Sequence, residues 1–216
     1  MNQSSKQRVR AQYDAVAPAY ERRWSRYVDA SVNATLTHLT VQPGERVLDV
    51  GCGTGLLLAR LAERAPAGHL AGVDLSPAMI GEARRRLPDH VLLAVADAED
   101  LPFATASFEV VVSSSAFHYW PAPARALAEL RRVLCQEGRV VITDWCDDYL
   151  ACRVGDRLLR LVDPAHRRIY GRAECATLLT DAQYQVTAIE RYRISWLWGL
   201  MTAAARRPGA SPGHSR

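Results

Sequence analysis

The stretch Arg46-Val-Leu-Asp-Val-Gly-Cys-Gly-Thr-Gly55 decides the fold, because it joins a short apolar segment to three closely spaced glycines. Val47, Leu48 and Val50 are bounded by turn residues, which is the pattern of a strand buried on both faces. The run that begins at Leu56 then opens a helix. Because a strand, a glycine loop and a helix follow one another, we predict a ligand at the loop.

The glycine loop itself indicates what kind of ligand binds. Gly51, Gly53 and Gly55 allow positive φ and let peptide N–H groups approach a ligand with no side chain between. Leu56 stands where a nicotinamide-binding loop carries its third glycine, so the spacing departs from the dinucleotide fingerprint. Asp49 suits a cationic ligand and would repel a phosphate. The loop therefore favours S-adenosylmethionine over a dinucleotide.

A second acidic residue lies at the end of the next predicted strand, His69–Asp74. Ser76 and Pro77 follow as the N-cap and first residue of a helix. Asp74 comes about 20 residues after the first glycine, the interval at which a carboxylate reaches an adenosine ribose. One carboxylate has two oxygens for the two hydroxyls of a ribose. We therefore predict that Asp74 binds the ribose.

With these motifs in this order, the chain resembles a class I S-adenosylmethionine-dependent methyltransferase of the ubiquinone/menaquinone C-methyltransferase-like group (methyltransferase type 11 domain). The resemblance spans roughly residues 10 to 145. One departure is Cys135-Gln-Glu-Gly138, where the family usually has a Pro-Gly-Gly turn, and we expect Gly138 alone to serve that turn. The motifs that carry the resemblance are Tyr13–Tyr20, Val47–Gly55, Gly72–Ser76, Ala96–Phe103, Phe108–Val112 and Leu130–Val141.

The alternation of strands and helices predicts an α/β fold with a parallel sheet and helices on both faces. The resemblance implies a Rossmann-like, doubly wound, mostly parallel seven-stranded sheet with a C-terminal antiparallel hairpin. Besides the two strands above, the predicted elements are strands over His90–Ala96, Phe108–Ser113 and Arg139–Trp145, helices over Leu56–Ala65, Ala78–Leu87, Pro123–Leu134 and Arg172–Thr180, and the hairpin over Gln185–Arg191 and Ile194–Leu200.

Three parts of the chain are expected to differ in role. Residues 1–30 form an N-terminal helical lid, and residues 31–205 form the cofactor-binding domain with a substrate-capping segment at about 145–172. The Pro-, Gly- and Ser-rich residues 206–216 are expected to form a disordered tail.

Tyr13 and Tyr20 lie seven apart, hence on one face of a helix, where core packing is the simpler interpretation. The resemblance implies instead that they approach the methionine end of the cofactor, where a cation–π contact is worth roughly 0.5–2 kcal/mol.

The resemblance also implies the adenine contacts. Asp97 would accept a hydrogen bond from the exocyclic amine, and the backbone N–H of Ala98 would reach a ring nitrogen. Leu75 and Met79 would pack on the purine, although core packing explains Met79 about as well. The candidate cofactor residues are Tyr13, Tyr20, Asp49, Gly51, Cys52, Gly53, Gly55, Asp74, Leu75, Met79, Asp97, Ala98 and Ser114.

Methyl transfer from a sulfonium is an in-line displacement, in which positioning can supply about 7–11 kcal/mol. A general base is needed only when the acceptor must lose a proton. His118, just after the predicted strand Phe108–Ser113, is the candidate catalytic base, since imidazole titrates near neutral pH. A packed or helix-capping histidine is an equal alternative.

Aromatic residues concentrate where the acceptor is expected to bind, and they suit a small aromatic, quinol-like or lipid-like molecule. For at least half of them, a hydrophobic wall under the hairpin is the simpler interpretation. Polar side chains of the same region fit no metal template, so no metal is expected. The aromatic residues are Trp145, Tyr149, Tyr170, Tyr192, Trp196 and Trp198, and the polar ones are Asp144, Asp147, Asp148 and His166.

Composition excludes several classes of protein. The chain has 216 residues, 49% hydrophobic and 23% charged, ordinary values for one globular domain. No apolar run is long enough to span a bilayer, and the first residues contain no apolar signal-peptide segment. We therefore expect a cytoplasmic protein, monomeric or homodimeric, with no integral membrane segment.

The five cysteines (52, 135, 146, 152 and 175) form no disulfide or metal framework and are expected to be reduced.

The net charge of +4 is too small to indicate a nucleic-acid partner. One segment is nevertheless rich in arginine. It could attract an acidic substrate or a lipid surface, whereas a solvated helix face is the simpler interpretation. The arginines are Arg153, Arg157, Arg160, Arg167, Arg168 and Arg172.

Two other classes of function are weighed against a methyltransferase. A NAD-dependent oxidoreductase is disfavoured by the missing third glycine and by the lack of a Tyr-x-x-x-Lys pair. A non-catalytic cofactor-binding protein would keep the fold without turnover. The intact Asp49, Asp74 and Asp97 argue against a decayed cofactor site.

Overall fold

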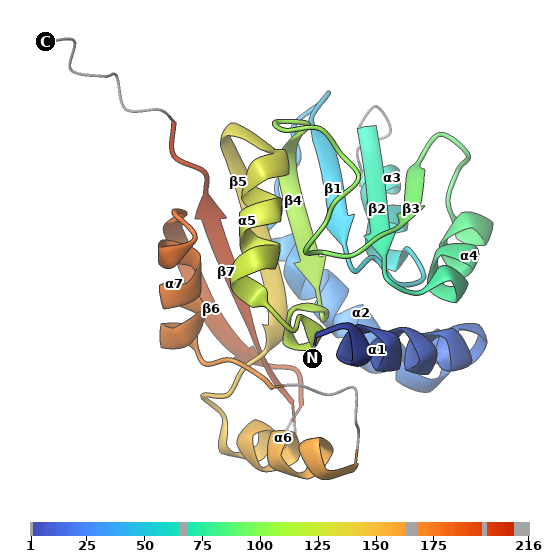
Figure 1. The fold of residues 1–216 in the computed structure, drawn as a ribbon, viewed down its shortest axis with the longest axis vertical. Coiled ribbons are helices and arrows are strands. Elements are labelled where there is room, and N and C mark those ends of the chain that lie inside the picture. Colours follow the sequence, from blue (N-terminus) through green and yellow to red (C-terminus); the bar gives the residue numbers. More distant parts are fainter. Residues whose placement is uncertain (1, 65–68, 163–167, 196–197, 210–216) are drawn as a thin grey trace, which may run out of the picture.

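The computed structural model describes residues 2–64, 69–162, 168–195 and 198–209. A seven-stranded sheet in the order β3-β2-β1-β4-β5-β7-β6 lies at its centre (Figure 1). The strands are β1 (Arg46–Val50), β2 (His69–Asp74), β3 (Leu92–Val95), β4 (Phe108–Ser114), β5 (Leu134–Trp145), β6 (Gln185–Arg193) and β7 (Gly199–Arg206). The helices are α1 (Asn2–Val16), α2 (Tyr20–Thr37), α3 (Leu56–Arg64), α4 (Pro77–Arg86), α5 (Pro123–Val133), α6 (Leu150–Val162) and α7 (Arg172–Asp181), with short 3-10 helices η1 (Ala17–Ala19) and η2 (Phe117–Tyr119).

The pairing of the strands confirms the predicted fold class. β3, β2, β1, β4 and β5 are parallel, and β7 runs antiparallel between β5 and β6. The chain winds outward from β1 in one direction and from β4 in the other. In sheets of this kind, ligands bind outside the carboxyl ends of the strands at that switch point.

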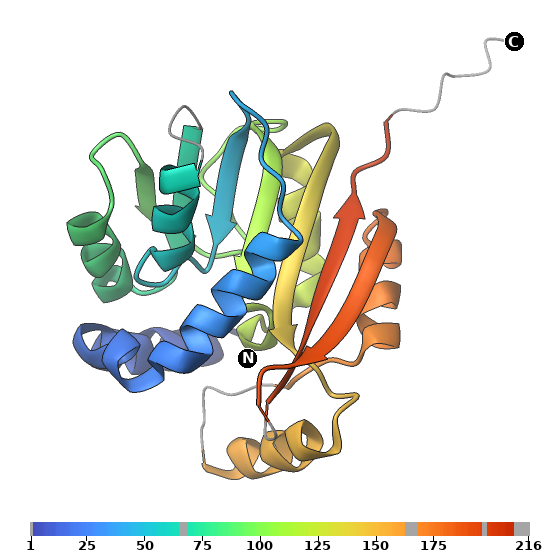
Figure 2. The ribbon, with the colours of Figure 1, turned by 180° about the vertical axis from the view of Figure 1, so that it is seen from behind.

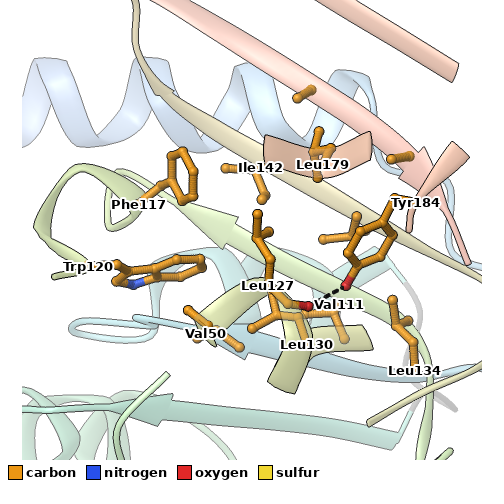
Figure 3. Close-up of a cluster of buried hydrophobic side chains, with 14 of the residues drawn as sticks. Val50, Val111, Phe117, Trp120, Leu127, Leu130, Leu134, Ile142, Leu179 and Tyr184 are labelled. Atoms are coloured by element: carbon orange, nitrogen blue, oxygen red, sulfur yellow. Dashed lines mark hydrogen bonds between the residues drawn. The ribbon is translucent and has the colours of Figure 1, made fainter. Parts of the chain in front are cut away.

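Helices cover both faces of the sheet, as the alternating pattern predicts. Because side chains alternate along a strand, Leu48 and Val50 pack with α5 and α7, whereas Val47 packs with α2, α3 and α4. Figure 1 shows α5 and α7 in front of the sheet, and Figure 2 shows α2 and α3 on the reverse face. In the first core, Tyr184 Oη donates a hydrogen bond to the Leu127 carbonyl at 3.1 Å (Figure 3).

The N-terminal segment forms two helices. Pro18 lies in η1, and its ring blocks a continuous helix because proline has no backbone N–H and clashes with the preceding turn. Tyr13 and Tyr20 therefore lie on different helices, and the prediction that they share one helix face is wrong. Their ring centroids are nevertheless 5.9 Å apart. The second helix continues to Thr37, beyond the expected limit of the lid at residue 30.

The last strand differs most from its prediction. Instead of Ile194–Leu200, β7 occupies Gly199–Arg206. Ile194 N–H donates to the Trp198 carbonyl at 3.0 Å, so these residues belong to the turn before the strand. The strand lies between β5 and β6 and is rich in alanine, which is uncommon in strands. The sequence therefore contained little indication of a strand at these residues.

The turn inside β5 also differs from its prediction. Glu137, and not Gly138, has positive φ (61°). Gly138 instead permits close backbone contact, since a Cβ there would lie 2.8 Å from the Cys135 carbonyl oxygen and 3.1 Å from that of Glu109. The glycine is needed for packing, and the turn is made by its neighbour.

Most other predicted elements agree within one or two residues. The strand β3 is shorter than His90–Ala96, because a turn in which Val91 N–H donates to the Pro88 carbonyl precedes it. The expected capping segment 145–172 contains the helix α6. Arg206 ends β7 and Arg207 Nη1 donates to the Arg131 carbonyl at 3.1 Å, so the segment expected as a tail starts in contact with the fold. Residues 210–216 and Ala65 lie outside the described residues.

Candidate functional site

A pocket opens at the carboxyl ends of the parallel strands. Its space, counted out into the open solvent at its mouth, is about 1070 Å³. The loops after β1, β2, β3 and β4 line it, together with α1 and α2. The structure brings together in its lining the predicted cofactor residues Tyr13, Tyr20, Asp49, Gly51, Cys52, Gly53, Asp74, Leu75, Met79, Asp97, Ala98 and Ser114.

The three glycines of the loop have different roles. All have positive φ, which the loop conformation requires. A Cβ on Gly51 would lie 2.4 Å from Ala116 Cβ, and one on Gly55 would lie 2.8 Å from Leu87 Cδ1, so these two glycines allow close packing. A Cβ on Gly53 would meet nothing within 4 Å. Only Gly53 therefore leaves open space beside the pocket, and Gly55 packs against α4 away from it.

Asp49 is the most unusual charged group of the pocket. Its carboxylate is buried, and Oδ1 has no hydrogen-bond partner among the described residues. Burial, with a smaller contribution from the charge of Asp74, raises the pKa of Asp49 to about 8. A buried carboxylate oxygen without a partner is costly. A cationic ligand with N–H donors would satisfy it, so the residues present fit S-adenosylmethionine.

Asp74 is held by the two loops that flank it. Gly53 N–H donates to its Oδ2 and Ser76 N–H to its Oδ1, both at 2.9 Å. Burial raises its pKa, and these backbone hydrogen bonds oppose the rise. Each oxygen keeps a second lone pair, so the fixed carboxylate can still accept from a diol.

Asp97 and α1 close the far end of the pocket. Lys6 Nζ lies 2.5 Å from Asp97 Oδ2 and 2.8 Å from Glu99 Oε2. The other oxygen of Asp97 accepts from Glu99 N–H at 2.9 Å. The helix α1 is thus tied by an ion pair to the residue predicted to read the adenine.

Further contacts join the N-terminal helices to the cofactor loops. Asp14 accepts from Ser76 Oγ at 2.6 Å and from Ala78 N–H at 3.3 Å. Arg86 binds Glu21 through both guanidinium Nη atoms and also donates to the Thr54 carbonyl at 2.8 Å. The two N-terminal helices are therefore held against the loops that line the pocket.

Aromatic rings surround the space beyond the glycine loop. Tyr13 contacts Tyr119 edge to face with centroids 5.4 Å apart, and Tyr27 contacts Trp145 in the same way at 6.0 Å. Trp198 lies 5.8 Å from Tyr27. Tyr27 is buried and Tyr13 is half-buried, and desolvation raises the pKa of both phenols well above the usual value. Of these rings, those of Tyr13, Tyr27 and Tyr119 line the pocket.

His118 lies next to the pocket and not in its lining. Its Nδ1 is 2.7 Å from Asp144 Oδ1, and its backbone N–H donates to Asp144 Oδ2 at 2.8 Å. The ring stacks on Trp145 at 5.5 Å and touches Tyr119, the nearest lining residue. Asp144 at Nδ1 would orient the imidazole of a general base, but the burial of the ring fits equally well a histidine that only packs in the core.

The other expected acceptor residues fall into separate groups. Trp145 and Trp198 reach the aromatic cluster, whereas Tyr170 packs on Phe117 and Tyr192 stacks on His38. Tyr149 fills the space beside Gly199. Trp196 and His166 lie outside the described residues.

The arginine-rich segment lies on the surface. Arg153 pairs with Asp147, Arg160 with Asp156, Arg168 with Glu174 and Arg172 with Asp148. These pairs neutralise much of the charge, which fits the solvated interpretation, while Arg167 lies outside the described residues.

Several lining residues were not predicted. Tyr27 follows Tyr20 by the same seven-residue step that was noted for Tyr13, and Ser115 and Tyr119 flank His118 closely, so the sequence held signals for them. Lys6 had no signal, because its role depends on how α1 crosses the sheet edge. The unpredicted lining residues include Lys6, Val9, Tyr27, Thr54, Ser115, Tyr119 and Trp120.

Comparisons with known proteins agree with this geometry. A model of the methyltransferase domain matches residues 48–142. The chain is 42% identical over 130 residues to a malonyl-[acyl-carrier protein] O-methyltransferase of Geobacter sulfurreducens, covering 59% of this chain and 46% of that protein. It is 37% identical over 216 residues to the protein of the same name from Herminiimonas arsenicoxydans, covering 94% of this chain and 78% of that protein.

A solved structure shows the same fold. A chain from the complex between the Haloferax volcanii Trm112 methyltransferase activator and a putative methyltransferase superposes with a TM-score of 0.82 at 22% identity, covering 95% of this chain and 100% of that chain. The fold is that of a Rossmann-like methyltransferase. The chain belongs to the methyltransferase-domain family of S-adenosylmethionine-dependent methyltransferases.

Family membership bears on the alternatives. It confirms the resemblance and disfavours a NAD-dependent oxidoreductase. The chain spans about half the length of the first curated relatives it matches. Within the described ranges, no helix is long and apolar enough to cross a membrane, and no three His, Cys, Asp or Glu side chains are grouped to hold a metal ion. All five cysteines are free thiols.

Proposed function

We propose that the protein transfers a methyl group from S-adenosylmethionine to a small organic acceptor. The observation that carries this proposal is the buried Asp49, whose Oδ1 lacks a partner among the described residues beside the open Gly53. A cation is the ligand that such a group favours, because a positive charge stabilises the ionised carboxylate, whereas the pyrophosphate of NAD would oppose its ionisation. In this proposal Asp74 binds the ribose, Asp97 and Ala98 bind the adenine, and Leu75 and Met79 cover the ring.

When bound, the cofactor would supply a methyl group activated by the positive charge on sulfur. The residues of the chain would provide positioning and exclude water. Gly53 lets the backbone approach the ligand, and the aromatic end formed by Tyr13, Tyr20, Tyr27 and Tyr119 keeps the reacting space dry. Positioning of this kind can contribute about 7–11 kcal/mol, so a dedicated base is not required for every acceptor.

The aromatic lining supports an aromatic, quinol-like or lipid-like acceptor. The 37% identical relative that covers most of this chain is named for a malonyl group on acyl-carrier protein, which adds a carboxylate on a carrier-bound chain to the candidates. A cytoplasmic location and a monomeric or homodimeric state complete the proposal. The buried free thiols suit a reducing compartment.

Calorimetry with S-adenosylmethionine, S-adenosylhomocysteine and NAD tests the cofactor. We expect low-micromolar binding of the first two and none of NAD. Methyl transfer is then measured with radiolabelled cofactor against malonyl thioester, quinol, phenol, amine and thiol acceptors. NAD binding as tight as that of S-adenosylmethionine would refute the proposal, and light scattering measures the oligomeric state.

A further inference from the structure

Ser115 ends a chain of hydrogen bonds that leads into the pocket. Trp145 Nε1 donates to Tyr27 Oη, and Tyr27 Oη donates to Ser115 Oγ at 2.7 Å. An indole N–H can only donate, so the direction of the bond from Trp145 to Tyr27 is fixed. Tyr27 has one hydroxyl hydrogen, which it gives to Ser115. The hydrogen of Ser115 is therefore directed away from Tyr27.

The backbone holds Ser115 in the lining of the pocket. Its φ is +59°, a conformation that costs about 1 kcal/mol or more for a residue with a side chain. Ser115 N–H donates to the Thr143 carbonyl at 2.8 Å. The next residue, Ala116, rests against Gly51, where a Cβ would lie only 2.4 Å away. The hydroxyl of Ser115 is thus fixed beside the glycine loop.

The neighbouring Ser113 shows the contrast. Ser113 Oγ donates to the Val50 carbonyl at 2.7 Å, so its hydrogen is used inside the fold, and the residue does not line the pocket. Ser115 lines the pocket and accepts the hydrogen bond from Tyr27. Burial keeps the Tyr27 phenol protonated at neutral pH, so the direction of the chain does not change.

We propose that Ser115, supported by Tyr27 and Trp145, binds an oxygen of the methyl acceptor, and that the acceptor presents an oxyanion, a carboxylate or a phenolate, to the cofactor. This inference rests on the proposed function. A hydrogen-bond donor gains most from a charged oxygen. An amine would direct its own N–H groups against this donor, and sulfur is a weak acceptor.

The chemistry balances without a further reactant. A lone pair on the acceptor oxygen forms the new bond to the methyl carbon, while the carbon–sulfur bond breaks and its electron pair returns to sulfur. A carboxylate is ionised at neutral pH, so no proton moves and no base is required. A phenol must first lose its proton. The position of His118 beside Tyr119, outside the lining, is consistent with the carboxylate case.

The test measures binding apart from turnover. The full chain is saturated with S-adenosylhomocysteine and titrated with malonyl-coenzyme A, a carboxylate, and with 1,4-naphthohydroquinone, a phenol. Ser115→Ala and Ser115→Gly should each weaken binding of the oxygen probe by about tenfold or more, with unchanged affinity for S-adenosylhomocysteine. Tyr27→Phe should give a smaller loss. Ser113→Ala, the matched control, should bind both ligands as the wild type does.

The two Ser115 variants separate the hydroxyl from the backbone. Glycine relieves the positive φ and alanine does not, so loss in alanine with full binding in glycine would mean that Ser115 only shapes the loop and would overturn the inference. Methylation of amines or thiols, with no binding of either oxygen probe, would also overturn it while the proposed function stands. Failure to bind S-adenosylhomocysteine would refute the proposed function instead.

The pH dependence of kcat/KM distinguishes the two oxyanions. A carboxylate acceptor should give a flat profile between pH 6 and 9, because it is ionised throughout. A phenol should give a rate that rises with pH toward the phenol's own pKa. Either profile supports the oxyanion site, and the Ser115 variants should lower it at every pH.

Discussion

At the scale of single residues, Asp49 has the charge that a bound cofactor would change most. Its pKa in the free protein is about 8, so it holds a proton at neutral pH, and a bound cation would lower that pKa. We expect binding of S-adenosylmethionine to release a proton below pH 8, and affinity to rise with pH up to about 8. Calorimetry at pH 7 in buffers of different ionisation enthalpy measures the release.

Asp49→Asn is the control for this proton release. It should abolish both the release and the pH dependence and should weaken binding.

The raised pKa of Asp49 also predicts how the stability of the fold depends on pH. Because the folded pKa lies above the unfolded value of 3.8, the folded protein binds the extra proton between pH 4 and 8, and its stability should fall as pH rises through that window. A wild-type stability that rises across this range relative to Asp49→Asn would contradict the assignment.

Asp74→Ala tests the ribose contact. Each hydrogen bond to a charged group is worth roughly 1.5–3 kcal/mol, so cofactor affinity should fall at least about tenfold. Asp74 also accepts from Gly53 and Ser76 N–H, and Asp74→Asn, which keeps one acceptor oxygen, should lose less. Circular dichroism checks the fold, and normal binding in a folded Asp74→Ala variant would refute the role.

His118→Ala separates a base from a packing residue. If His118 is a general base, its replacement should lower kcat by about 10²-fold and leave cofactor affinity unchanged. Since His118 is buried between Trp145 and Tyr119 with Nδ1 at Asp144, removal of the ring should also reduce stability by about 2–4 kcal/mol. The measurements are kcat against pH and thermal unfolding. An unchanged pH profile with lowered stability would assign the residue to packing.

At the scale of elements, we expect ligand exchange to disturb α1, because its residues Lys6, Val9 and Tyr13 line the pocket. It is held by the ion pair of Lys6 with Asp97 and by the contacts of Asp14 with Ser76. We expect S-adenosylhomocysteine to slow hydrogen exchange in residues 2–16 more than in α7. Lys6→Ala should speed cofactor dissociation, whereas Arg168→Ala, on the distant surface, should not. Equal protection of both helices would argue against a lid.

The sequence predicted best the elements whose pattern comes from local chemistry. The glycine loop, Asp74 at the end of β2 and the Ser76 N-cap all follow from backbone rules that depend on a few adjacent residues. Prediction from the sequence failed where contacts between distant parts of the chain decide the local structure. Alanines became a central strand because β7 is enclosed by β5 and β6, Glu137 took the turn that was expected of Gly138, and Pro18 divided the lid helix. Lys6 entered the site only through the crossing of α1 over the edge of the sheet.

At the scale of the whole molecule, cofactor binding should stabilise the fold by mass action. A ligand at 100 times its dissociation constant adds about 2.7 kcal/mol, which for a domain of this size raises Tm by about 5–11 °C. Thermal unfolding with and without S-adenosylhomocysteine measures the shift. Asp74→Ala should reduce it at the same ligand concentration, and a wild type whose Tm does not move would argue against cofactor binding.

The close contact of Gly51 with Ala116 has a consequence for engineering. Because Gly51 has no side chain, its backbone packs directly on Ala116 in the loop after β4. The two loops therefore form one unit, here called the cassette, that has to be exchanged as a whole. A transplant of acceptor preference from a relative should succeed when residues 49–55 and 113–120 are moved together and should fail when either is moved alone. Among the described residues, no backbone hydrogen bond joins this cassette to α6 or to the hairpin of β6 and β7, so those elements could be exchanged separately to alter which molecules reach it.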